Sequence, residues 1–398
     1  MKKIVQFIKP YTLQIVFVII LIAIQSMCDL FLPALMSEII TNGVMKSDLA
    51  AVYQIGLRMG VVVIAGMITT IYAGLIASKV AAGFSKLARN EVFKKVEEFS
   101  KKEFSSISTS SLITRITNDV TQVQTVILMS LRMMVTAPLM CIGGIVMVIN
   151  KDTRLSGLFI VVLPIVLLVI VLKARKLIPL MSSLQKKIDK ITQVAREKLI
   201  GVKVIRAFNK EEYERVRYDK VNKDAYITHL KGLQILASMM PTMMLIIQLN
   251  MVAILWLGAA RVEAAGMEVG DLMAFIQYAN LIMFSVIMLT MVFVLVPRGI
   301  VSAKRIAEVL NTPLSVKDKK KAIENSNKMK RGTIEFKNVS FKFDKNAEPV
   351  LKDITFKIES GETLAILGGT GSGKTTMLDL MLRFYDPTEG EVYIGGQN

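Results

Sequence analysis

The sequence predicts a membrane all-α domain of six helices with long intracellular helical extensions, followed by the N-terminal part of an α/β domain. Three observations predict this fold class. The chain of 398 residues is 53% hydrophobic and has a mean hydropathy of +0.50, which is too apolar for an ordinary soluble protein. Six apolar stretches reach the length of about 20 residues that a bilayer-spanning helix needs. Beyond residue 332, the hydrophobic period changes from that of helices to that of strands.

Each apolar stretch is expected to cross the membrane once. The six stretches are residues 11–36, 53–77, 128–149, 155–173, 237–260 and 272–297. The connectors after the first, third and fifth stretches are short, whereas residues 78–127 and 174–236 are long, charged and helical in pattern. We therefore expect the membrane helices to continue into water as two hairpins, each projecting on the order of 35 Å at the helical rise per residue.

The distribution of charge predicts the orientation. The formal net charge is +18, and basic side chains concentrate in the second long connector. By the positive-inside rule, the hairpins, both termini and everything after residue 297 are expected in the cytoplasm, as in a multi-pass protein of the cell membrane. This placement accounts for most of the positive charge, so nucleic acid is not an expected partner. Cys28 and Cys141 lie in apolar runs, which favours reduced thiols over a disulfide.

Composition divides the chain into three parts. Residues 1–310 contain the six apolar stretches and are expected to form the membrane domain. Residues 311–332 are polar and rich in lysine, as is typical of a linker. Residues 333–398 begin with short alternating runs that predict strands, so part of a soluble α/β domain is expected there.

One motif in this last part indicates a specific chemistry. A glycine-rich loop lies between residues 364–367, a predicted buried strand, and residues 377–384, a predicted helix, and it matches the phosphate-binding pattern G-x-x-x-x-G-K-[ST]. The loop and its flank are Gly368, Gly369, Thr370, Gly371, Ser372, Gly373, Lys374, Thr375 and Thr376. Lys374 is expected to neutralise the β- and γ-phosphate oxygens of a nucleotide, and Thr375 to ligate Mg²⁺. The alternative is a glycine-rich turn that binds nothing, which the order of strand, loop and helix disfavours.

An aromatic side chain upstream of this loop is a candidate for binding the base. Phe343 ends the run Phe341-Lys342-Phe343, and its ring has the flat apolar face on which a base can stack. The competing interpretation is that an aromatic pair in a strand belongs to the core of the domain.

Together these segments resemble a bacterial ATP-binding cassette (ABC) exporter half-transporter, in which six membrane helices are fused to a C-terminal nucleotide-binding domain. The resemblance covers essentially the whole chain. It is carried by the order and spacing of residues 338–343, residues 349–354, the phosphate-binding loop and residues 383–390. Within the family, the chain resembles a subunit of heterodimeric multidrug exporters. The resemblance places Phe343 at the adenine-stacking position, where the family more often has tyrosine.

The resemblance also implies a role for the two hairpins. Residues 111–120 look like the tip of the first intracellular loop, and residues 196–208 lead into the second. In such exporters these tips dock on the nucleotide-binding domains, the second on that of the partner subunit. The implied coupling residues are Arg115, Asn118, Asp119, Arg206 and Phe208. The alternative is a solvated hairpin with no mechanical role.

The family's remaining catalytic elements are expected beyond Asn398. These are the Walker B carboxylates, the signature sequence and the switch histidine. No catalytic residue is therefore expected in residues 1–398, and these residues alone are not expected to hydrolyse ATP efficiently. Residues 395–397 echo the signature sequence but are expected to form a β-turn. Whether the sequence is a fragment or a truncated product stays open at this point.

Polar residues at membrane depth are candidates for a substrate path, because they are costly there. They are Asp29, Gln25, Gln248, Asn250 and Gln277. For Asp29, a structural hydrogen bond is the competing interpretation.

The predicted function is that of a subunit of an ATP-driven exporter. It would move amphipathic or hydrophobic compounds, whether drug, lipid or peptide, by alternating access, with ATP and Mg²⁺ as cofactors. A second half-transporter is the expected partner, in a heterodimer or alternatively a homodimer, and membrane lipid surrounds the pair. The alternative is a truncated or regulatory subunit that does not hydrolyse ATP and modulates a complete partner.

Overall fold

The computed structural model describes residues 2–317, 332–344 and 346–397, which form two compact units. The first unit consists of Met1–Ile15, Ala77–Leu128 and Leu295–Asn398, and the second of Val16–Ile76 and Met129–Val294. Several long helices pass from one unit into the other, and each unit is described by itself. Residues 318–331 of the predicted linker lie outside the described residues, and the division at residues 310 and 332 stays a prediction.

Six helical segments of the described chain are long and apolar enough to cross a membrane, which confirms the predicted number. Their helices are α2 (Thr12–Glu38), α3 (Leu49–Glu97), α6 (Val120–Lys151), α7 (Thr153–Ile200), α10 (Met239–Glu263) and α11 (Val269–Asn311). In the fifth segment, α10 directly follows α9 (Glu211–Ala237). The long helices exceed a bilayer: α3 has 49 residues and α7 has 48, on the order of 70 Å each, because their apolar period continues beyond the membrane-length stretch.

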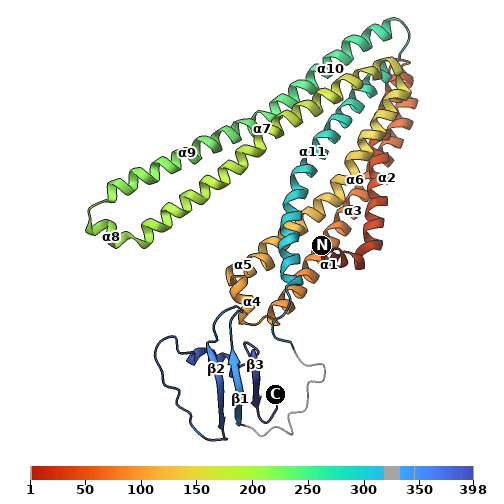
Figure 1. The fold of residues 1–398 in the computed structure, drawn as a ribbon. Coiled ribbons are helices and arrows are strands. Elements are labelled where there is room, and N and C mark those ends of the chain that lie inside the picture. The colour runs from red at the N-terminus through yellow and green to blue at the C-terminus, as the bar shows by residue number, and fades with distance from the viewer. Residues whose placement is uncertain (1, 318–331, 345, 398) are drawn as a thin grey trace. The chain divides into compact units, whose positions relative to one another are not determined.

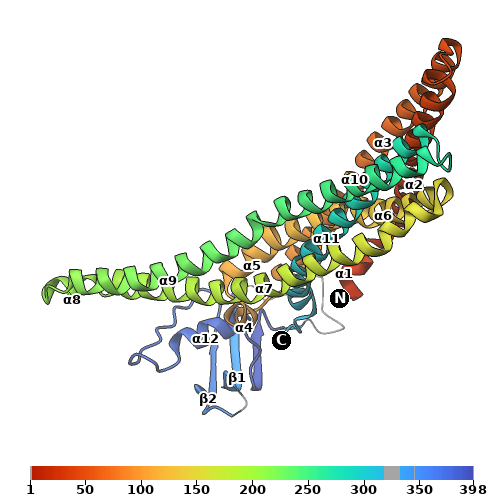
Figure 2. The same ribbon diagram turned by 90° about the horizontal axis from the view of Figure 1, so that it is seen from above.

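The helices α7 and α9 form an antiparallel pair closed by the short helix α8 (Val202–Ala207), and they lie side by side in Figures 1 and 2. Charged side chains join the two arms. Lys187 donates to Asp224 at 2.7 Å and to the Thr228 hydroxyl at 2.7 Å. Nearer the tip, Arg217 donates to Glu197 at 2.6 Å. This pair corresponds to the second predicted hairpin.

In the second unit, the helices pack around an apolar core. Its largest fully buried side chains include Tyr278 and Phe275 of α11 and Ile254 of α10. The Tyr278 hydroxyl donates to the carbonyl oxygen of Leu30 in α2 at 2.9 Å, so its polar end is satisfied inside the core. This contact fixes α11 against α2 at the level of Asp29.

The first unit contains the turn between α3 and α6. Two short helices form this turn, α4 (Lys101–Ser106) and α5 (Thr109–Thr114), and a π-helical segment η3 (Arg115–Asp119) leads into α6. The α3 side chains Phe84, Ala88 and Val92 are buried here together with Ile306 and Val309 of α11. The continuation of α3 beyond the membrane segment therefore has its own core, as the periodicity predicted.

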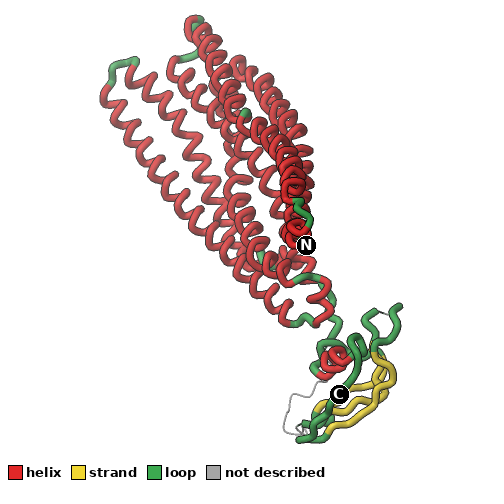
Figure 3. The backbone as a smooth tube through the Cα atoms, turned by 90° about the vertical axis from the view of Figure 1, so that its left-hand side faces the viewer, coloured by secondary structure: helices red, strands yellow, loops and turns green. Residues whose placement is uncertain are grey.

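The C-terminal part of the first unit contains a three-stranded antiparallel sheet and one short helix (Figure 3). The strands β1 (Ile334–Phe341), β2 (Leu351–Ile358) and β3 (Glu389–Ile394) have the order β2-β1-β3. Helix α12 (Lys374–Met381) packs Leu380 against the buried strand residues Phe336, Val339, Phe341 and Leu351. The sheet thus supports the helix that starts at the phosphate-binding loop.

The predicted buried strand at residues 364–367 is wrong for this structure. These residues are not in a strand, and Leu364 and Leu367 are 45% and 91% exposed. A strand needs a hydrogen-bonded neighbour, and each pairing described for the sheet joins β1 with β2 or β3. The apolar composition of the run was therefore not sufficient to make it a strand.

Candidate nucleotide-binding site and the residues around it

The glycine-rich loop is shaped by backbone angles that favour glycine. Gly371 and Gly373 have φ angles of +86° and +90°, which residues with a side chain rarely adopt. A Cβ atom on Gly373 would lie 2.7 Å from Cδ2 of Leu351 and 3.1 Å from the carbonyl oxygen of Val350. The loop therefore passes directly against the start of β2 before it enters α12, and a larger residue would displace it.

Lys374, the first residue of α12, folds back over the loop. Its Nζ donates to the carbonyl oxygens of Gly368 at 2.7 Å and Gly369 at 2.6 Å, and lies 3.4 Å from Oγ of Ser372. A fixed cation is thus held at the start of a helix, where the helix dipole also favours an anion. This arrangement suits the phosphates of a nucleotide.

The two threonines after Lys374 differ in exposure. Thr375 is exposed, so its hydroxyl is available to a ligand, whereas Thr376 is 7% exposed. Among the described residues, no group of three or more His, Cys, Asp and Glu side chains is arranged to hold a metal ion. A hydroxyl such as that of Thr375 is an oxygen donor of the kind that Mg²⁺ takes together with phosphate oxygens, so the chemistry of the loop fits this ion. Thr370 and Ser372 are also exposed on the same loop.

Phe343 lies just beyond β1 in a cluster of three aromatic rings. Its ring is 5.0 Å from that of Phe341 and 5.5 Å from that of Tyr385, edge to face in both cases, and it is 49% exposed. Phe341 is the register partner of Leu351, the residue against which Gly373 lies. Phe343 is therefore linked to the loop through two intervening residues, Phe341 and Leu351, and part of its ring remains accessible to a base.

Sequence analysis missed a contact between α4 and α12. Nζ of Lys101 donates to Oδ2 of Asp379 at 2.7 Å, across 278 positions of sequence. Beside Lys101, the carboxylate of Glu103 accepts from the backbone and hydroxyl of Ser100 and from the backbone of Ser315. The pattern S-x-x-E at residues 100–103 is a helix-capping signature that could have located α4, although not its partners.

The predicted coupling residues of the first loop contact α11. Arg115 forms an ion pair with Glu308 at 3.0 Å, and Asp119 accepts a hydrogen bond from Ser302 at 2.7 Å. Asn118 is exposed between them. The structure therefore brings Arg115 and Asp119 together with the end of the sixth membrane-length helix.

The predicted coupling residues of the second loop lie at the tip of the α7–α9 pair. Arg206 is in the last turn of α8 and is exposed, and Phe208, which follows α8, is 71% exposed. A large aromatic side chain at such a tip costs free energy when it faces water. The tip therefore has the exposed apolar ring of Phe208 close in sequence to the positively charged side chain of Arg206.

The polar residues at membrane depth occupy different environments in the second unit. The side chain of Gln25 forms a hydrogen bond with Asp29, one turn later in α2. Asn250 is 4% exposed, and its Oδ1 has no hydrogen-bond partner among the described residues. Gln248 and Gln277 are exposed in this chain. Among the described residues, no network of hydrogen bonds joins these five side chains into one cluster.

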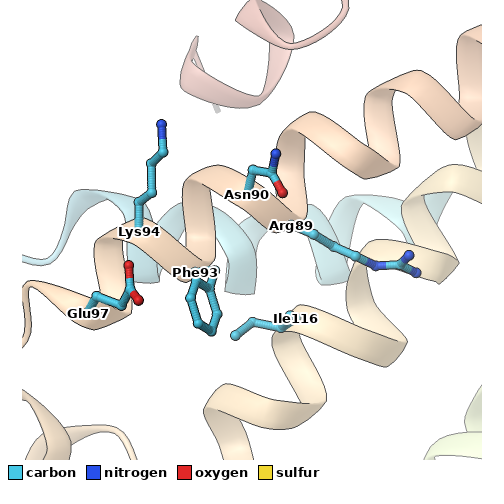
Figure 4. A pocket seen from close by; sticks show the side chains of 6 residues that line it. All are labelled: Arg89, Asn90, Phe93, Lys94, Glu97 and Ile116. Atoms are coloured by element: carbon cyan, nitrogen blue, oxygen red, sulfur yellow. The ribbon is translucent and has the colours of Figure 1, made fainter.

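The first unit also has a pocket of about 430 Å³ on the extension of α3 (Figure 4). In this view Phe93 of α3 points toward Ile116 of η3, Glu97 and Arg89 lie to either side, and Lys94 points away from them. Arg89 donates to the Thr121 hydroxyl at 3.0 Å. The lining mixes both signs of charge with apolar surface, so it does not indicate one class of ligand.

Comparison with known protein families gives two matches. The model described as "ABC transporter transmembrane region" matches residues 15–286, and the model described as "ABC transporter" matches residues 351–398. The second match includes the phosphate-binding loop and all of α12.

Several known proteins are similar along the chain. The uncharacterized ABC transporter ATP-binding protein YfiB of Bacillus subtilis is 36% identical over 99% of this chain and 68% of its own length. An uncharacterized ABC transporter ATP-binding protein of Mycobacterium tuberculosis, MT1311, is 34% identical over 98% of this chain and 67% of its own. The ATP-dependent lipid A-core flippase of Hahella chejuensis is 29% identical over 81% and 55%.

Proposed function

The chain belongs to the family of ABC transporters, and on that premise we propose that it is a subunit of an ATP-driven exporter. It moves amphipathic or hydrophobic compounds across the cytoplasmic membrane by alternating access. This proposal rests on one observation. The described chain has both six membrane-length helices and a phosphate-binding loop with Lys374 folded over it. A soluble ATP-binding protein would not need the first, and a membrane protein that uses no nucleotide would not need the second.

In this proposal ATP binds with its phosphates in the loop and its base against Phe343. Lys374 neutralises phosphate oxygens, and its present hydrogen bonds to Gly368 and Gly369 are exchanged for bonds to the nucleotide. Thr375 ligates Mg²⁺ together with phosphate oxygens. The nucleotide supplies the free energy that changes the arrangement of the helices.

The exposed tip of the α7–α9 pair supports a second subunit as partner. Phe208 and Arg206 dock on the nucleotide-binding domain of that subunit, which removes the 71%-exposed phenylalanine ring from water. The partner is a second half-transporter, in a heterodimer or, as the alternative, a homodimer. Arg115 and Asp119 transmit motion in the first loop through their contacts with α11, and the exposed Asn118 lies between them in the same loop.

The charge of the long helical extensions supports cytoplasmic termini. The arms of α7 and α9 carry a large share of the lysine and arginine side chains, and such a bias keeps loops on the cytoplasmic side. The same orientation places the phosphate-binding loop in the compartment that contains ATP.

Polar groups at membrane depth support a substrate path in the membrane. Asn250 has a buried oxygen without a partner in the described chain, and Asp29 lies beside the contact between Leu30 and Tyr278. Such groups are costly in lipid, and contact with a polar part of an amphipathic substrate would offset the cost. A relative named as a lipid A-core flippase supports lipid-like compounds as one class to test.

Substitution of Lys374 tests the proposal. In membranes containing the full-length protein, Lys374→Ala should lower the affinity for ATP by at least about tenfold and abolish ATP-dependent transport, because the phosphates lose their main cation. Lys352→Ala, at an exposed lysine of β2, is the matched control and should change neither quantity. Unchanged ATP affinity and transport in Lys374→Ala would remove the loop from the mechanism. Binding of ATP without turnover in the unsubstituted protein would favour a regulatory subunit instead.

A further inference from the structure

The six-residue helix α4 contacts two segments that come much later in the sequence. Lys101 contacts α12, and Glu103 contacts Ser315, which follows α11. We infer that α4 is a positioning element for ATP-driven transport: Lys101 holds the helix that carries the phosphate-binding loop, while Glu103 holds the chain leaving the sixth membrane-length helix. This inference rests on the proposed function and adds two residues that the family resemblance did not imply.

The contact between Lys101 and Asp379 acts on the loop through α12. Asp379 lies five positions after Lys374 on a helix of only eight residues, so the two move together as parts of one rigid element. The Asp379 side chain is 12% exposed and the Lys101 side chain 48%, with 2.7 Å between Nζ and Oδ2. A hydrogen bond between opposite charges is strong and directional. It therefore fixes the position of α12 relative to α4.

Glu103 forms the second contact with a nearly buried carboxylate. It is 4% exposed and accepts hydrogen bonds from Ser100 N at 2.8 Å, Ser100 Oγ at 2.5 Å and Ser315 N at 2.9 Å. The hydroxyl oxygens of Ser100 and Ser315 are 2.7 Å apart. A buried carboxylate with these donors is costly to separate from them. Glu103 therefore holds Ser315 firmly to the start of α4.

Ser315 is close to the end of α11, which ends at Asn311. The intervening Leu314 packs against the apolar cluster that contains Phe99 and Ile107, on either side of α4. Two residues beyond Ser315, the carbonyl oxygen of Lys317 accepts a hydrogen bond from Arg383 at 2.9 Å. Because Arg383 follows α12, the three segments α4, the chain after α11, and α12 with the residues that follow it each contact the other two.

The contacts of Lys101 and Glu103 give α4 a role distinct from that of Arg115 and Asp119. Those two residues bond to α11 itself, whereas α4 bonds both to the chain after α11 and to α12. A displacement of α11, the sixth membrane-length helix, therefore displaces α12 through the contacts of α4. In the same way, a displacement of α12 when ATP binds displaces α11. Lys101 is thus a positioning residue, because it acts on the nucleotide through Asp379 and α12.

A charge exchange between Lys101 and Asp379 tests this role. In the full-length protein, Lys101→Glu should raise the KM for ATP about fivefold and reduce the stimulation of turnover by transported compound, because two carboxylates then face each other. Adding Asp379→Lys should restore both values to within about twofold, and Lys101→Arg alone should retain them. Lys102→Glu, at the exposed neighbouring lysine, is the control and should leave the KM unchanged.

A KM for ATP that is the same in Lys101→Glu as in the unsubstituted protein would overturn the inference while leaving the proposed function intact. Failure of the unsubstituted protein to bind ATP would overturn both. Since Asp379 is nearly buried and its substitution can impair folding, the single variants Lys101→Ala and Lys101→Arg give an independent comparison. An altered KM in Lys101→Ala together with a normal KM in Lys101→Arg supports the role, and equal values in the two variants contradict it.

A disulfide tests the other side of α4. The 2.7 Å between the hydroxyl oxygens predicts that Ser100→Cys with Ser315→Cys, in a protein lacking Cys28 and Cys141, forms a disulfide on mild oxidation. The pair Ser106→Cys with Ser315→Cys, at the other end of α4, is the matched control and should cross-link far less. The crosslinked protein should retain its KM for ATP, because the crosslink preserves the contact. Absence of the first crosslink, or equal crosslinking of both pairs, would overturn the assignment of Glu103.

Discussion

Arg261 donates two hydrogen bonds to one carboxylate oxygen of Asp152, from Nε at 3.0 Å and from Nη2 at 2.8 Å. The other oxygen of Asp152 accepts from the backbone of Arg154 and Leu155 and so caps the start of α7. Arg261 lies in the last turn of α10. Burial alone would raise the pKa of Asp152, but the hydrogen bonds from Leu155, Arg261 and Arg154 outweigh it, and the pKa lies below its usual value of 3.8. One carboxylate therefore joins the ends of two membrane-length helices.

Replacement of Arg261 should destabilise the protein. Arg261→Ala leaves Asp152, whose side chain is 3% exposed, without its counter-ion and should lower the free energy of unfolding by about 2 kcal/mol. Thermal unfolding in detergent, followed by circular dichroism, measures the change. Arg58→Ala, at an exposed arginine of α3, should change it by less than about 0.5 kcal/mol. Equal losses in both variants would contradict the role of the pair.

A second polar cluster should couple α6 to α11. Lys151 contacts the Asp271 carboxylate, which also accepts a hydrogen bond from Ser37 of α2 at 2.6 Å. Both charged side chains are less than one-third exposed, so a double-mutant cycle with Lys151→Met and Asp271→Asn should give a coupling energy of about 1–3 kcal/mol.

The control for this cycle is an exposed pair on one segment of chain, Lys46 and Asn42. Its coupling energy should be within about 0.5 kcal/mol of zero. If the Lys151–Asp271 pair gave a value as small as this, the cluster would not hold the helices together.

Acid should weaken the contact between α4 and Ser315. Burial acts to raise the pKa of Glu103, but the hydrogen bonds from Ser100 and Ser315 outweigh it, so its pKa lies below the usual value of 4.5. A carboxyl group with a lowered folded-state pKa stabilises the fold above its unfolded pKa, and this stability is lost as the pH falls through the folded pKa. Stability should therefore decrease more steeply between about pH 5 and pH 3 in the unsubstituted protein than in Glu103→Gln. Glu91→Gln, at an exposed glutamate, should keep the original slope.

Phe343 should contribute to nucleotide affinity through its ring rather than through a polar group. Phe343→Ala should weaken binding of ATP about tenfold, because stacking of a base on an aromatic ring is lost. Phe343→Tyr should bind at least as well as phenylalanine, since it keeps the ring. Fluorescent-nucleotide titration measures both variants, and ADP should show the same ratio because it has the same base. A tenfold loss in both variants would exclude stacking as the cause.

The membrane helices were predictable because hydropathy depends on local sequence. The helical pattern of residues 78–127 also predicted that α3 continues beyond the membrane segment, and the α3 side chains of Val80, Phe84 and Val92 in this stretch are buried. In contrast, the apolar run at residues 364–367 suggested a strand that the structure lacks. Strand formation depends on a pairing neighbour, and composition does not identify one.

The candidate site was predictable only in part. The phosphate-binding loop is continuous in sequence, so its glycines, Lys374 and Thr375 could be named from the pattern alone. The contact between Lys101 and Asp379 joins residues 278 positions apart, and neither is part of a recognisable motif. Such a contact depends on how distant elements pack, which local spacing does not encode.

In the proposed function, nucleotide bound at Lys374 drives transport. The most direct measurement is the accumulation of an amphipathic fluorescent compound in inside-out membrane vesicles that contain the full-length protein, compared with ATP, with ADP and with ATP in the Lys374→Ala variant. We predict accumulation with ATP alone in the unsubstituted protein, and background levels with ADP and in the variant. Equal accumulation under all three conditions would show that ATP bound at Lys374 does not drive transport.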